Sequence, residues 1–156
     1  MKKVFLLLAS HLAVLLVGFA LGIYLLPILS APPAPSAAEA AAAGQGARYT
    51  AQFRRDLKGS DALHYGVGRI TIAPTTIALA GKVTPGPAYK LYLVPEFVET
   101  EADFLRVKAR SLAVGDIKTF ENFIVPLAPG TPLENYDTVL VWCESFSQFI
   151  TAAKYR

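Results

Sequence analysis

Hydrophobic and polar positions divide the chain into three parts. After Lys2 and Lys3 the sequence is apolar from Val4 to Leu29. From Ala31 to Gly46 it consists of Ala, Pro, Ser, Gly, Glu and Gln, and beyond Arg48 short apolar runs alternate with turn-forming residues. We therefore predict three segments: an N-terminal transmembrane anchor (1–30), an Ala- and Pro-rich flexible linker (31–47) and one folded domain (48–156).

The N-terminal apolar run is long enough to be a retained membrane anchor. About 20 apolar residues cross a bilayer, whereas the apolar region of a secretory signal is typically about 7 to 15 residues long. Lys2 and Lys3 precede the run and no basic residue follows it until Arg48. The positive-inside rule then predicts a single-pass protein with a cytoplasmic N-terminus and a periplasmic or extracellular domain.

Two further features of the N-terminal part bear on oligomerisation and on the distance between the domain and the membrane. Gly18 and Gly22 form a Gly-x-x-x-Gly pair, which would let a second helix approach closely and predicts a homodimer. The linker contains nothing that builds a core. If it is extended at about 3.1 Å per residue, it would hold the domain a few tens of ångströms from the membrane.

The C-terminal domain has the pattern of an all-β protein. Its apolar runs are short and are separated by Gly, Pro, Asn and Asp, which predicts strands joined by turns. Regularly spaced strands without a long amphipathic helix favour an antiparallel β-sandwich. The predicted strands are Tyr49–Phe53, Gly66–Ile72, Thr76–Leu79, Tyr89–Val94, Leu105–Leu112, Phe123–Pro126 and Thr138–Cys143.

Charge along the domain argues against nucleic-acid binding. Of the 15 basic residues, Lys2 and Lys3 precede the anchor, which leaves 13 against 12 acidic residues, and a nucleic-acid footprint needs a concentrated basic surface. Strict alternation places Arg106, Lys108 and Arg110 on one face of a predicted strand. That basic stripe is either a solvated outer face or a docking face for an acidic partner.

The only cysteine and the only tryptophan are adjacent, as Trp142 and Cys143 at the end of an apolar run. A single cysteine cannot form an internal disulfide, so in an exported domain it is either a buried structural residue or a reactive thiol. Alternation places Cys143 on the same face as Val139 and Val141, and we expect that face to be interior.

Few residues of the domain are able to carry catalysis. His64 is its only histidine, which leaves no basis for a hydrolase triad or a complete metal site. Cys143 and His64 together offer a nucleophile and base, or two ligands of a metal or haem. Their separation in the sequence leaves their distance open, and we expect no stand-alone enzyme.

Four blocks between Leu63 and Tyr155 form a specific pattern. They are His64-Tyr65-Gly66-Val67-Gly68, Gly86-Pro87 before Leu91-Tyr92-Leu93, Val114-Gly115-Asp116-Ile117-Lys118 before Phe123-Ile124-Val125-Pro126, and Tyr136-Asp137-Thr138-Val139 with Val141-Trp142-Cys143-Glu144-Ser145-Phe146 and Phe149. Together these blocks resemble the DM-thirteen electron-transfer family, a β-sandwich module related to the DOMON group and found in Skeletor-type and membrane-anchored bacterial proteins. The family usually has an acidic residue after Gly-Pro, where this chain has Ala88.

This resemblance implies that Cys143 is the redox residue, as a bare thiol or as the ligand of haem or another prosthetic group, with His64 and Trp142 shaping its surroundings. The implied function is a membrane-anchored redox or electron-transfer accessory module. A single thiol would then need a redox partner protein, because its cycle passes through a sulfenic acid or a mixed disulfide. The alternative is a non-enzymatic adhesion, ligand-binding or protein-binding module in which Cys143 is structural.

Overall fold

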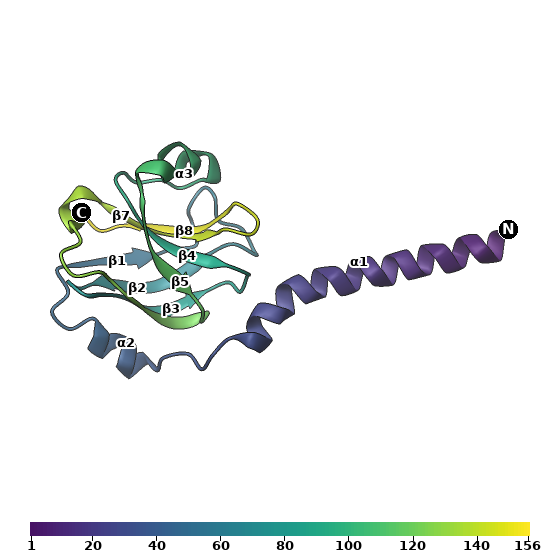
Figure 1. The fold of residues 1–156 in the computed structure, drawn as a ribbon, viewed down its shortest axis with the longest axis horizontal. Helices are drawn as coiled ribbons and strands as arrows, with labels where there is room; N and C mark the ends of the chain where they lie inside the picture. Colours follow the sequence, from purple (N-terminus) through teal and green to yellow (C-terminus); the bar gives the residue numbers. More distant parts are fainter.

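The computed structural model describes residues 1–156 and contains two antiparallel four-stranded sheets that face each other (Figure 1). One sheet has the strand order β1-β2-β3-β6 and the other β5-β4-β7-β8. The predicted all-β antiparallel sandwich is thus confirmed. The strands are β1 (Tyr49–Phe53), β2 (Gly66–Ile72), β3 (Thr76–Val83), β4 (Tyr89–Val94), β5 (Leu112–Ile117), β6 (Glu121–Pro126), β7 (Thr138–Cys143) and β8 (Gln148–Lys154).

Strand β7 is buried on both faces and separates two hydrophobic clusters. Val139, Val141 and Cys143 belong to the main core between the sheets, as the alternation predicts. Leu140 and Trp142 point the other way, into a second core on the outer face of the β5-β4-β7-β8 sheet. A strand covered on both sides is apolar at nearly every position, because neither set of alternate residues meets water.

The outer cluster is covered by helix α3 (Glu101–Val107), which continues into a 3-10 turn, η1 (Lys108–Arg110). The predicted strand over Leu105–Leu112 is therefore wrong at every position except Leu112, where β5 begins. The Thr100 side chain accepts a hydrogen bond from the Asp103 backbone N–H and caps the helix. Phe104 and Val107, three residues apart, then face the core, while Leu105 remains exposed.

The basic stripe predicted on that strand does not form. Its three cations instead lie on α3 and η1, and each makes an ion pair: Arg106 with Asp103 at 2.6 Å, Lys108 with Glu144 at 2.7 Å, and Arg110 with Glu96 at 3.1 Å. Local carboxylates balance these cations, so the docking face proposed for an acidic partner loses its basis.

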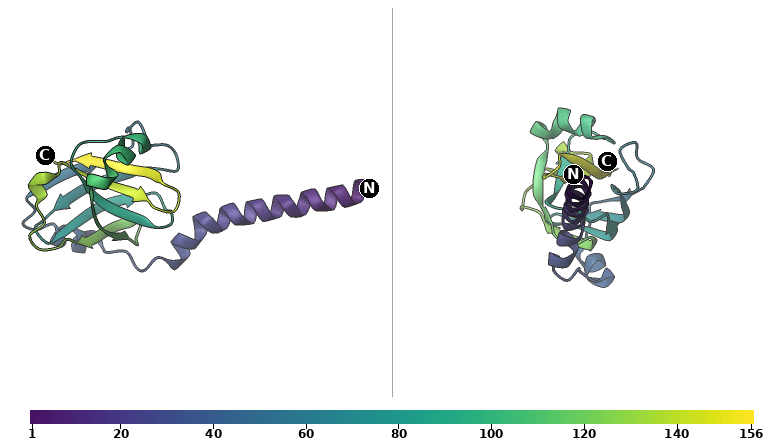
Figure 2. Two further views of the ribbon diagram at one scale, coloured as in Figure 1. Left: turned by 45° about the horizontal axis from the view of Figure 1, so that its top comes forward. Right: turned by 90° about the vertical axis from the view of Figure 1, so that its right-hand side faces the viewer.

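Helix α1 (Lys2–Ser30) extends away from the sandwich and is the one helix with the length and composition to cross a membrane (Figures 1 and 2). None of its residues is buried, and its apolar side chains are exposed except for Ile23 and Pro27, which are partly covered. Pro27 lies within its last turn, and Ala31 ends it in an extended conformation.

The segment between α1 and the sandwich is folded onto a sheet instead of forming a free linker. A capping box between Ser36 and Glu39 starts helix α2 (Ala37–Ala43), which packs on β3 and β6. Ala40 is only 2% exposed. Thr76 Oγ1 donates to the Ala43 carbonyl at 3.0 Å, and Asn122 Nδ2 donates to the Pro35 carbonyl at 2.9 Å. Alanine supplies a flat surface here, which explains why composition alone indicates no core.

The helical assignment of α3 can be tested by truncating its buried anchor. We expect Phe104→Ala to lower the free energy of unfolding by about 3–5 kcal/mol, because a fully buried aromatic ring leaves a cavity. Leu105→Ala, the next residue on the same helix, is the control and should cost well under 1 kcal/mol because its side chain is exposed. Urea unfolding followed by circular dichroism measures both; similar losses would contradict this packing.

Candidate functional site

The single thiol lies at the end of β7, inside the sandwich and directly beneath the turn between β3 and β4. Cys143 is 2% exposed, and its Sγ–H donates to the Pro87 carbonyl at 3.1 Å. The backbone of β7 pairs Cys143 with Tyr89 of β4 and with Gln148 of β8. The thiol therefore has a fixed position, with its proton engaged by a main-chain oxygen.

The surroundings of Cys143 favour the neutral thiol. Burial raises its pKa above the ordinary value; the backbone N–H groups of Phe146 and Ser145 oppose this, and the charge of Glu144 adds to the increase. Since the thiolate is the nucleophilic form, the thiol is unreactive at neutral pH while this geometry holds.

A cavity of about 350 Å³ lies at this end of the sandwich and brings the thiol together with the domain's only histidine. Its volume lies at the lower end of the range of about 300–1,000 Å³ for small-molecule sites. The final turns of α1 contribute part of the wall. The lining residues are Ile23, Tyr24, Leu63, His64, Pro85, Gly86, Pro87, Tyr89, Cys143, Phe146, Gln148 and Ile150.

The histidine in this cavity is oriented by a carboxylate. Asp61 Oδ1 accepts hydrogen bonds from the backbone N–H groups of Leu63 and His64, and Asp61 Oδ2 lies 2.9 Å from His64 Nδ1. The His64 hydrogen bond is the main reason that the pKa of Asp61 is held below its usual range. With Nδ1 donating to the carboxylate, Nε2 is left as the proton acceptor or ligand atom of the ring.

Trp142 does not share this cavity, although it is adjacent to Cys143 in the sequence. It is fully buried in the outer cluster, where its ring lies 4.9 Å from that of Phe104 and its Nε1 has no hydrogen-bond partner. The alternation of the strand separates the two neighbours. Of the three site residues predicted from the sequence, the fold brings Cys143 and His64 together and places Trp142 on the opposite face of the sheet.

A polar cluster next to Cys143 has no signal in the local sequence. Glu144 accepts a hydrogen bond from the Tyr92 hydroxyl and one from Lys108 Nζ at 2.7 Å. Burial raises the pKa of Glu144, but the bonds to Lys108 and Tyr92 outweigh it and hold the pKa below its usual range. Lys108 Nζ also lies 5.1 Å from the Trp142 ring centre, within cation–π range. Residues 92, 108 and 144 meet only through the tertiary fold.

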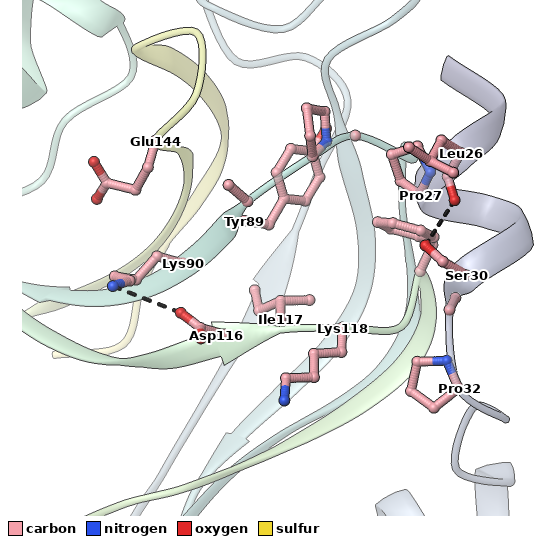
Figure 3. Close-up of a pocket in the computed structure, with 15 residues that line it drawn as sticks. Leu26, Pro27, Ser30, Pro32, Tyr89, Lys90, Asp116, Ile117, Lys118 and Glu144 are labelled. Carbon is pink, nitrogen blue, oxygen red and sulfur yellow. Dashed lines mark hydrogen bonds and ion pairs between the residues drawn. The ribbon is translucent and has the colours of Figure 1, made fainter. Parts of the chain in front are cut away.

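A second groove, of about 510 Å³, runs between the sandwich and the end of α1 and shares Tyr89 with the first cavity (Figure 3). Lys90 and Asp116 form an ion pair there at 3.6 Å. Lys118 also lines the groove and forms no ion pair within the sandwich. The groove thus presents a free cation close to the last turn of α1.

Two residues beside the cavity have backbone angles that side chains rarely adopt. Ala88, directly after Pro87, and Ser147, directly after Phe146, both have φ of 50°. The left-handed conformation costs an L-residue roughly 1–2 kcal/mol. Such strained positions concentrate in segments with a functional constraint, and here they lie in the two turns that enclose Cys143.

Fold and site together define a β-sandwich module with one enclosed thiol that shares a cavity with an imidazole. The family model described as Electron transfer DM13 matches residues 56–155. Because the match covers most of the chain, the protein belongs to the electron transfer DM13 family, and the resemblance found in the sequence is confirmed. No curated protein and no solved structure matches the chain.

The buried thiol and tyrosines predict a loss of stability at alkaline pH. Burial is the largest cause of the raised pKa of Cys143, Tyr89, Tyr92 and Tyr155. Each group stabilises the fold fully below its unfolded pKa, and that contribution is lost as the pH rises toward the folded pKa. The free energy of unfolding should therefore fall above about pH 8.5, the reference for cysteine.

Replacing Cys143 separates the contribution of the thiol to this loss of stability from that of the tyrosines. In Cys143→Ala the decline should begin only near pH 10, the reference for tyrosine. Urea unfolding of the detergent-solubilised chain between pH 7 and 11, followed by fluorescence of the single Trp142, measures the difference. Identical pH profiles for the two proteins would show that the thiol titrates normally in the folded state.

Proposed function

We propose that this protein is a membrane-anchored, extracytoplasmic electron-transfer module whose redox group is the thiol of Cys143. The observation that carries the proposal is the convergence of Cys143 and His64 on one cavity, although they are far apart in the sequence. Membership of the electron transfer DM13 family gives the class of function. The domain contains no other thiol and no other imidazole, so this cavity holds its strongest candidates for redox and proton transfer.

The residues fit a bare thiol better than a ligand of a prosthetic group. Cys143 Sγ is directed at the Pro87 carbonyl and holds its proton, whereas a ligating sulfur must be deprotonated and free. Cys143 and His64 supply two donors, and no cluster of three or more His, Cys, Asp or Glu residues is placed to hold a metal ion. We therefore derive no step that passes through haem or a metal.

The thiol chemistry is an exchange with a disulfide of a partner protein. Sγ of Cys143 attacks one sulfur of the partner disulfide, a new S–S bond forms, and the partner's second sulfur leaves as a thiolate. In this step the Cys143 sulfur passes from the thiol to the disulfide level, and the leaving sulfur of the partner passes from the disulfide to the thiolate level. His64 Nε2 is the group in the cavity that accepts the thiol proton, and the proton ends on the leaving sulfur. A thiol of a second, reduced dithiol protein then attacks Sγ of Cys143, which releases the first partner as a dithiol. The donor's second thiol closes the donor's own disulfide and restores the Cys143 thiol, so that two electrons pass from the donor to the first partner.

The enclosed state of Cys143 provides control over this exchange. A neutral, hydrogen-bonded thiol resists stray oxidation, and displacement of the Pro87 and Phe146 turns exposes it to a docked partner. Local opening of such loops requires much less free energy than global unfolding. The strained residues Ala88 and Ser147 lie in these two turns, which lowers the free energy needed to move them.

The proposal is tested by the route through which a disulfide reagent reaches Cys143. We expect dithiobis(nitrobenzoate) to react with the folded, detergent-solubilised chain at a rate that hardly changes with urea concentration below the unfolding transition, because only the turns open. Phe146→Ala should raise this rate severalfold by opening the mouth of the cavity. Leu105→Ala, also exposed but on α3, should leave it unchanged. The released thionitrobenzoate is measured by absorbance.

A non-enzymatic binding module with a structural cysteine is the second candidate, and the 2% exposure of Cys143 favours it. In that case labelling would follow global unfolding, with a urea dependence of about 1–3 kcal/mol per molar. Phe146→Ala would then have no effect on the rate beyond its effect on stability. This outcome would contradict the redox proposal and favour the cavity as a ligand-binding site.

A further inference from the structure

The end of the sandwich that faces α1 carries exposed apolar side chains on its loop tips. Leu63, before β2, is 63% exposed, and Phe146, in the β7–β8 turn, is 55% exposed. Within the sandwich the other large exposed apolar residues are Phe97 and Leu105. Pro85 and Pro87 extend the apolar surface between the two tips, since they line the same cavity as Leu63 and Phe146. We call Leu63, Pro85, Pro87 and Phe146 the apolar rim.

The apolar rim lies beside the later turns of α1, because its four residues line one cavity with Ile23 and Tyr24. Phe146 and Pro87 line one depression together with Gly18, Gly22 and Ile23 of the helix. The two glycines have open space on their free side. The predicted dimer through Gly18 and Gly22 stays a prediction, and this glycine face borders the Phe146 loop.

The length of α1 places this contact at the edge of the bilayer. The hydrocarbon core takes about 20 helical residues, and a span that begins after Lys3 therefore ends close to Ile23. Gly22, Ile23 and Tyr24 are then at the outer boundary of the core, where aromatic side chains such as that of Tyr24 are favoured. A loop tip that reaches the level of Gly18 to Ile23 cannot avoid the headgroup layer.

The connection from α1 to the sandwich leaves little freedom to move away. Helix α2 is docked through Ala40, and Pro35 accepts a hydrogen bond from Asn122. Only residues 31–35 separate Ser30 from this attachment. At about 3.1 Å per residue for a Pro-rich chain, they reach roughly 15 Å. Lys118, next to the last turn of α1, adds a cation at the level of lipid phosphates.

We infer that the apolar rim is a membrane-docking surface whose Leu63 and Phe146 side chains insert into the lipid interface beside α1. Its partner is the bilayer that holds the anchor, so the inference rests on the proposed anchoring. The cavity with Cys143 and His64 then opens at the headgroup layer instead of into bulk water. A redox partner would have to reach it along the membrane surface.

The inference is tested by spin-label accessibility in the full chain, reconstituted in nanodiscs of phosphatidylcholine and phosphatidylglycerol. Cys143→Ala provides a cysteine-free background, into which Leu63→Cys, Phe146→Cys and the control Ala128→Cys are introduced. Ala128 is exposed in the loop after β6, at the opposite end of the sandwich. Labels at 63 and 146 should show a severalfold higher ratio of oxygen to nickel-chelate accessibility than the label at 128.

Two further measurements keep this result interpretable. A label at Val14→Cys reports whether α1 lies in the bilayer. If the label at 14 is exposed to lipid but the labels at 63 and 146 are exposed to water, the docking surface is contradicted while the anchoring of α1 is retained. Water exposure of the label at 14, or a mature protein whose mass shows that α1 has been removed, contradicts the proposed anchoring.

The second measurement uses Phe146→Trp in a chain that retains Cys143. Brominated lipids should quench the fluorescence of this variant far more than that of the original chain, which contains Trp142 alone. An equal degree of quenching in the two proteins would also overturn the inference.

Discussion

The burial of β7 on both faces is the constraint on which the rest of the structure depends. Its alternate residues are apolar on either side, so two layers must cover it. The β1-β2-β3-β6 sheet covers Val139, Val141 and Cys143, and α3 covers Leu140 and Trp142. The same constraint places the single thiol inside the sandwich and the single tryptophan outside it, with one peptide bond between them.

The chemistry of the site follows from how each ionisable group is compensated. Cys143 has lost its water and gained one carbonyl, which stabilises the protonated thiol. Glu144, the next residue, is compensated by Lys108 and Tyr92 on the other face of the sheet and stays ionised. Lys108 therefore cannot also serve to stabilise a thiolate. The imidazole in the cavity is that of His64, which Asp61 orients from its own loop.

The docked α2 segment links the site to the position of helix α1. A freely extended linker would let the domain adopt any orientation above a membrane, whereas α2 ties residues 36–43 to β3 and β6. The contacts are individually small: one buried alanine and two hydrogen bonds to backbone carbonyls. The end of the sandwich that holds Cys143 and His64 also borders α1, because Ile23 and Tyr24 line the same cavity.

The long apolar helix, the all-β class and the interior position of Cys143 were predictable from the sequence, because they depend on local periodicity and composition. The strand predicted from Leu105 was wrong because the alternation there coincides with a different apolar pair, Phe104 and Val107, at the three-residue spacing of a helix. The Thr100 cap starts that helix, and Leu105 is left exposed. Strand β8 had no clear pattern, since Ala152 and Ala153 are small on both faces. The meeting of Cys143 with His64, and of Glu144 with Lys108, required the tertiary structure, because only the register of strands far apart in the sequence brings such residues into contact.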